Sequence, residues 1–107
     1  MATTSKTLDR LRYLQDLYHQ GYRSNVVDRS LEKILALERA TAEHDLAELQ
    51  ERLKALEAHY HMSSEDFYRR FQAGELGDAA DFVEWSVFYE MCKSVQERLE
   101  VLRAEAA

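Results

Sequence analysis

The fold is decided by one long stretch between Val26 and Tyr60, VVDRSLEKILALERATAEHDLAELQERLKALEAHY. Its apolar residues recur at steps of three and four, the spacing that places them on one face of an α-helix. From Leu46 onward the steps alternate between three and four, which is the heptad spacing of a coiled-coil helix. Such a helix would be roughly 50 Å long at about 1.5 Å per residue. We therefore expect another long helix, or a second chain, to cover its apolar face.

Three further helices are predicted around this stretch. Each shows apolar residues at helical spacing, and Gly21 and Gly74 suit the left-handed stops that end two of the four helices. The last helix is long enough to pack antiparallel against the stretch that ends at Tyr60. The four predicted helices cover residues 6–20, 26–60, 64–73 and 79–104.

The composition supports an all-α protein. The chain has 107 residues, no proline and three glycines, so long helices can run uninterrupted, and its length suits a single all-α domain over residues 1–107. We predict an elongated helical bundle that contains a long antiparallel helical hairpin. A short N-terminal helix precedes the hairpin, and a short aromatic helix with its loop caps the bundle.

Charge and cysteine content narrow the expected environment. The 20 acidic and 14 basic residues give a formal net charge of −6, which disfavours direct binding to nucleic acid and favours a basic protein partner. The single cysteine, Cys92, excludes an intramolecular disulfide, and no segment has the roughly 20 apolar residues that span a membrane. The polar N-terminus lacks the apolar run of a signal peptide. We expect a cytoplasmic protein with no membrane partner.

Catalytic and metal-binding chemistry are not expected. His44 with Glu48, and Glu57 with His61, are each four residues apart and could touch a metal ion. Two ligands without a second cluster do not make a metal site. Cys92 falls on the apolar stripe of the last helix, where a thiol packs as a small apolar group. The sequence therefore predicts no enzymatic activity, cofactor or metal ion.

The aromatic residues are concentrated in one segment. Eight of the eleven lie between Tyr60 and Tyr89. The seven from Phe67 to Tyr89 could all seal the open end of the bundle. Alternatively, some could stay accessible and anchor a protein partner, as Tyr and Trp commonly do at interfaces.

Three stretches carry a resemblance to a known group of proteins: MSSEDFYRRFQAGELGD at 62–78, DFVEW at 81–85 and YRSNVVDR at 22–29. They resemble segments of small helical bacterial proteins that are commonly encoded next to a toxin gene. Those proteins are treated as antitoxin components of type II toxin–antitoxin pairs. The sequence departs from the general antitoxin pattern because it has neither a basic DNA-reading element nor a flexible tail rich in proline or glycine. The sequence therefore offers no candidate element for binding operator DNA.

The resemblance implies a non-enzymatic antitoxin that binds and neutralises a small, basic toxin. The expected contacts combine accessible aromatic residues with nearby acidic ones, because rim charges speed encounter and buried aromatics slow dissociation. These candidate partner-binding residues are Phe67, Tyr68, Phe71, Glu75, Asp78, Asp81, Glu84, Trp85 and Phe88.

Two other functions follow from the residues alone. The first is a structural or adaptor module that forms a homodimer through the helices at 26–60 and 79–104, since a four-helix assembly would cover their apolar stripes. This alternative is compatible with the antitoxin if the dimer is the form that binds the toxin. The second, with weaker support, is a helical bundle that binds a metal or another ligand.

Overall fold

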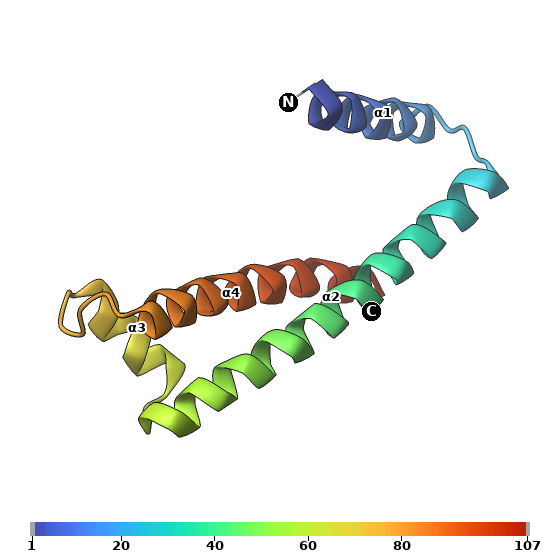
Figure 1. The fold of residues 1–107 in the computed structure, drawn as a ribbon. Coiled ribbons are helices and arrows are strands. Elements are labelled where there is room, and N and C mark those ends of the chain that lie inside the picture. The colour runs from blue at the N-terminus through green and yellow to red at the C-terminus, as the bar shows by residue number, and fades with distance from the viewer. Residues whose placement is uncertain (1, 107) are drawn as a thin grey trace. The chain divides into compact units, whose positions relative to one another are not determined.

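The computed structural model describes residues 2–106 of the chain, and all regular structure in that range is α-helical (Figure 1). This confirms the predicted fold class. The helix expected from residue 6 begins four residues earlier, at Ala2, and the other bounds lie within two residues of the prediction. Between residues 2 and 106, no helix combines the length and the apolar character needed to cross a lipid bilayer. The helices are α1 (Ala2–His19), α2 (Asn25–Tyr60), α3 (Ser64–Gln72) and α4 (Ala80–Ala106).

The chain divides into two compact units, and the boundary lies between Ile34 and Leu35. This boundary falls inside α2, so the helix contributes its first ten residues to the N-terminal unit and the remainder to the C-terminal unit. That the whole chain folds as one domain stays a prediction.

The N-terminal unit is a helical hairpin formed by α1 and residues 25–34 of α2. Gly21, at φ 98°, adopts the left-handed conformation that ends α1, as its position in the sequence predicts. The Tyr18 hydroxyl then fixes the turn: it donates to Asp28 Oδ1 at 2.6 Å, lies 3.0 Å from the Ser24 carbonyl, and accepts the Ser24 N–H at 3.1 Å. Ser24 Oγ in turn accepts the Val27 N–H at the start of α2. Side-chain hydrogen bonds therefore set this turn.

The C-terminal unit has an apolar core between α2 and α4. The two helices run antiparallel, because Arg39 of α2 donates to the Leu102 carbonyl near the end of α4, while Tyr60 donates to Asp81 near its start. The long antiparallel hairpin predicted from the apolar spacing is therefore present, with its core between the two stripes. The buried apolar side chains of this pair are Ala42, Leu49 and Leu53 from α2 and Trp85, Cys92, Val95, Leu99 and Leu102 from α4.

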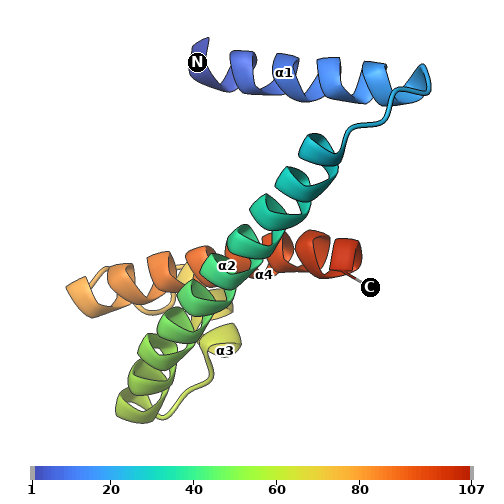
Figure 2. The same cartoon turned by 90° about the vertical axis from the view of Figure 1, so that its right-hand side faces the viewer.

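The short helix α3 closes one end of this pair and packs on α4 (Figures 1 and 2). Ser63 is its N-cap: the Ser63 hydroxyl accepts the Asp66 N–H at 3.1 Å, as N-cap serine side chains commonly do. Just past its C-terminus, Gly74 adopts φ 77°, which allows the chain to turn back toward α4. The cap and the glycine together hold α3 to nine residues.

Leu99 provides a direct test of the core between α2 and α4, because only 1% of its surface is exposed. Truncation by Leu99→Ala should lower the free energy of unfolding by about 2–5 kcal/mol, through lost burial and the cavity that remains. Urea unfolding followed by circular dichroism measures this change. Val101→Ala is the matched control, since Val101 lies on the same helix but is 72% exposed; its effect should stay within about 0.5 kcal/mol. Equal effects of the two substitutions would contradict this packing.

Candidate protein-binding surface

An aromatic core joins α2, α3 and α4. The rings of Phe67 and Trp85 stack almost parallel, with centroids 3.9 Å apart and planes at 3°, and neither side chain exposes any surface. Phe71 and Phe82 lie against Phe67 with centroids 5.4 and 5.7 Å away, and Tyr60 stacks on Trp85 at 5.7 Å. These five residues form the aromatic core, which gains both apolar burial and favourable ring geometry.

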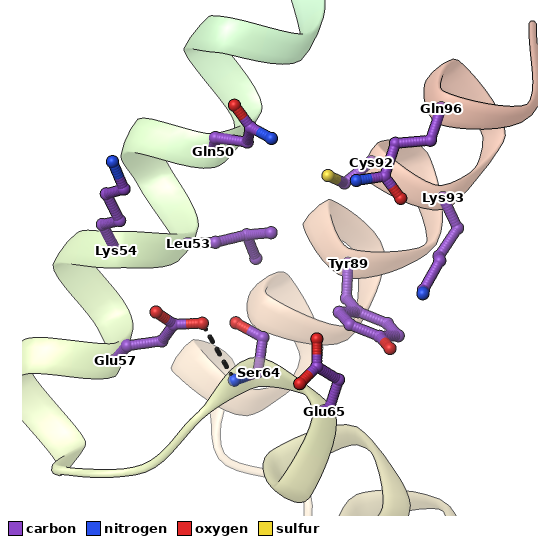
Figure 3. A pocket seen from close by; sticks show the side chains of 10 residues that line it. All are labelled: Gln50, Leu53, Lys54, Glu57, Ser64, Glu65, Tyr89, Cys92, Lys93 and Gln96. Atoms are coloured by element: carbon purple, nitrogen blue, oxygen red, sulfur yellow. Dashed lines mark hydrogen bonds between the residues drawn. The ribbon is translucent and has the colours of Figure 1, made fainter. Parts of the chain in front are cut away.

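A short chain of hydrogen bonds fixes the orientation of Trp85 within this core. The indole Nε1 donates to Ser64 Oγ at 2.9 Å. The Ser64 backbone N–H donates to Glu57 Oε2, also at 2.9 Å (Figure 3). Ser64 is itself buried, with 4% of its surface exposed. Trp85 of α4, Ser64 of α3 and Glu57 of α2 are thereby tied together, and the indole N–H is satisfied away from water.

Three of the nine candidate contact residues, Phe67, Phe71 and Trp85, therefore belong to the aromatic core. Phe67 and Trp85 are fully enclosed, so a partner cannot touch them while the unit is folded. The physical reason is that the short α3 turns the Phe67 ring directly onto the indole of α4. Part of the aromatic segment therefore seals this end of the α2–α4 pair, while Tyr68, Phe71 and Phe88 stay partly exposed.

The partly exposed aromatic candidates lie on different sides of the C-terminal unit. Tyr68 stacks on Tyr89 with ring centroids 4.6 Å apart, and its hydroxyl donates to Glu90 at 2.7 Å, a bond that raises the pKa of Tyr68 above its usual value. Phe88 instead borders a groove between α2 and α4, where the Arg52 guanidinium lies 5.1 Å above its ring. Phe71, although it belongs to the aromatic core, is partly exposed. The predicted aromatic contacts do not form one patch.

The four acidic candidates are exposed and cluster in sequence at the start of α4. Glu75 pairs with Arg70 at 3.4 Å, and Asp81 accepts the Tyr60 hydroxyl at 2.6 Å, which raises the pKa of Tyr60. Asp78 lies in the loop before α4, and Glu84 lies one turn into the helix. The loop before α4 and the first turns of α4 therefore carry exposed acidic side chains, which we call the acidic edge.

The structure also reveals a surface that the sequence reasoning missed. Val83, Val87 and Met91 follow one another at four-residue spacing along α4 and are 45%, 47% and 48% exposed. We call this row the α4 ridge. Met91 also borders the groove between α2 and α4, which has room for about 480 Å³ and also contains Phe88 and Leu49. The four-residue spacing was visible in the sequence, but only the packing shows that this side of α4 faces away from the core.

Two predicted contacts, Glu84 and Phe88, adjoin this ridge. Each neighbours a ridge valine in sequence, and the two are themselves one helical turn apart. The resulting surface combines large apolar side chains with an acidic margin. Contiguous exposed apolar surface with a polar rim is typical of protein interaction sites.

A second groove between α2 and α4 contains Cys92, with Leu53 and Tyr89 beside it (Figure 3). The thiol is 5% exposed, and burial raises its pKa, so the unreactive protonated form is favoured. The ten residues that line this groove include no histidine, and Glu57 there already accepts the Ser64 N–H. The arrangement therefore provides no activated thiol nucleophile.

In the part of the chain that the structure describes, neither of the two residue pairs that could touch a metal ion belongs to a larger group of possible ligands. His44 Nε2 lies 3.5 Å from Glu48 Oε2 on an exposed face of α2, while Glu57 is engaged by the Ser64 backbone. Over residues 2–106, the His, Cys, Asp and Glu side chains form no group of three or more that could hold a metal ion.

Comparisons with known proteins give no assignment: no family model, no curated protein sequence and no solved structure matches this chain.

The bond between Trp85 and Ser64 gives a testable stability contribution. Ser64→Ala leaves the buried indole N–H without an acceptor, which should cost about 1–3 kcal/mol of unfolding free energy. Urea unfolding monitored by Trp85 fluorescence measures the loss. Ser94→Ala, at an exposed position of α4, is the control and should change stability by less than about 0.5 kcal/mol. A neutral Ser64→Ala variant would show that the bond does not support the core.

The burial of Cys92 predicts slow chemical modification. In the folded protein, an aromatic disulfide reagent at pH 8 should react with Cys92 roughly 100-fold more slowly than in concentrated urea, because the thiol must first become accessible. The release of the coloured thiolate measures both rates. Reaction at the same rate in the two conditions would mean that Cys92 is open to solvent.

Proposed function

We propose that this chain is a non-enzymatic, cytoplasmic interaction protein, an antitoxin that binds and neutralises a basic toxin through the α4 ridge and the acidic edge beside it. The observation that carries this proposal is the row of half-exposed Val83, Val87 and Met91 next to exposed carboxylates. Large apolar side chains held in water at regular spacing are costly unless a partner covers them.

Charge supports a basic partner for this unit. From Leu35 onward the chain carries 16 acidic and eight basic residues, a formal charge of −8. Long-range attraction would speed the approach of a basic toxin to this unit, and contact with the ridge would then slow its release. The antitoxin identity itself depends on the resemblance of this chain to antitoxin proteins. The resembling stretches of this unit, residues 62–78 and 81–85, lie in and around the aromatic core and the start of the ridge.

The alternative of a homodimer through α2 and α4 receives less support. The apolar stripes of these helices pack on each other within one chain, where Leu49, Leu53 and Leu99 are buried. From Leu35 onward, the apolar stripes that motivated an intermolecular four-helix assembly are therefore largely covered within one chain. What stays uncovered on α4 is the opposite side, and its acidic margin favours a basic partner over an identical acidic one.

Binding to the product of the adjacent gene tests the proposal. Co-expression should give a complex that copurifies and should restore the growth of cells that express the toxin. Val87→Asp combined with Met91→Asp should weaken the complex by at least roughly 30-fold, since interface hot spots contribute 2 kcal/mol or more. Binding is measured by calorimetry, and growth rescue provides the cellular readout.

Two controls separate contact from folding. Val101→Asp changes a more exposed valine of the same helix, away from the acidic edge, and should leave the affinity unchanged. Circular dichroism should show the same helix content for all variants. Failure of the wild-type protein to copurify would refute the antitoxin assignment, whereas full affinity of the ridge variant would refute the ridge as its binding surface.

A further inference from the structure

The N-terminal hairpin has an apolar face that the hairpin itself does not bury. None of the side chains of residues 6–34 is buried. Leu8, Leu11 and Ile34 are 52%, 50% and 52% exposed. The face continues through Leu31, which is 36% exposed, and through three partly exposed side chains. Its members are Leu8, Leu11, Leu14 and Tyr18 of α1 and Val27, Leu31 and Ile34 of α2. We call this set the hairpin face.

Five members of this face, together with Gln15, line a groove between α1 and the start of α2. The groove has room for about 260 Å³, which is less than the roughly 300–1,000 Å³ of typical small-molecule sites. A groove of this size between two helices suits the side chains of another helix packed across it.

The turn holds this face ready for a partner. Tyr18 is hydrogen-bonded to both Ser24 and Asp28, and the Arg23 guanidinium lies 5.0 Å above the Tyr18 ring. These bonds keep α1 and α2 together although the unit has no buried core of its own. A preformed surface loses less conformational entropy on association than a flexible one.

We infer that the hairpin face is a homodimerisation surface, on which the hairpin of a second copy packs to complete a four-helix bundle. This inference does not depend on the antitoxin proposal. The extent of the face is of a suitable order: its seven side chains, four of them 36–52% exposed, leave on the order of 500 Å² of apolar surface in water. A specific interface of standard size buries about 800 Å² per partner, and at the roughly 65% apolar share of homodimer interfaces this corresponds to about 520 Å².

The charge of the hairpin also favours a second copy as the occupant. Residues 1–34 carry six basic and four acidic residues, whereas the rest of the chain carries the large negative excess. Two hairpins that are close to neutral can meet with little repulsion, and each has both signs of charge at its surface, for example in the ion pair of Arg12 with Asp9. A basic toxin would be attracted to the acidic C-terminal unit instead.

The molar mass of the full-length chain tests the inference. Sedimentation equilibrium should give twice the 12.5 kDa of one chain at micromolar concentrations. Leu8→Glu combined with Ile34→Glu places charges on the face but outside the groove-lining residues, so the turn and its hydrogen bonds stay intact. This variant should raise the dimer dissociation constant at least 100-fold. The matched control, Tyr13→Glu with Val26→Glu, changes exposed residues of the same two helices outside the face and should remain dimeric.

Hydrogen exchange of the wild-type protein gives a second test that needs no substitution. Raising the protein concentration through the dimer range should slow amide exchange in residues 8–34 and leave residues 80–106 unchanged. A wild type that stays monomeric at 100 µM would overturn the inference, as would concentration-dependent protection confined to α4, or equal dissociation of variant and control. Toxin binding through the α4 ridge is measured separately, so each proposal can fail without the other.

Discussion

The C-terminal unit depends on the environment of a single indole. Trp85 is stacked on Phe67, flanked by Tyr60 and hydrogen-bonded to Ser64, so one side chain of α4 contacts both α2 and α3. The fixed position of Trp85 sets the rotation of α4 about its own axis. That rotation buries Cys92, Val95 and Leu99, and it leaves the other side of the helix in water. The candidate binding surface is therefore a consequence of how the core is assembled.

The helices and their pairing could be predicted from the sequence because the signals are local. The apolar spacing and the two glycines, Gly21 and Gly74, act within one or two turns, and the absence of proline leaves the helices between them uninterrupted. The antiparallel pairing of α2 and α4 follows from two long apolar stripes joined by a short connection. The first helix extends further toward the N-terminus than the sequence predicts, because residues 2–5 (ATTS) carry no apolar periodicity.

The candidate site was harder to predict, since exposure depends on contacts between segments that are distant in sequence. Phe67 and Phe88 look alike in a helical pattern, yet α3 encloses the first and leaves the second at the edge of a groove. Val83 and Val87 carry no distinct signal in the sequence, because a short apolar row beside a longer apolar stripe cannot be told from a widening of that stripe. Only the side on which α4 packs against α2 shows that these valines face water while the longer stripe is buried. The exposure of the acidic candidates is easier to predict, because charged side chains near a loop are normally exposed.

Trp85 is the only tryptophan of the chain, and it is wholly enclosed. The protein therefore contains a natural optical probe at the junction of three helices. Its emission should be shifted to the blue while α3 is docked and should move to the red as soon as water reaches the indole, even if α2 and α4 stay helical. Detachment of the short helix can thus be distinguished from global melting without any label.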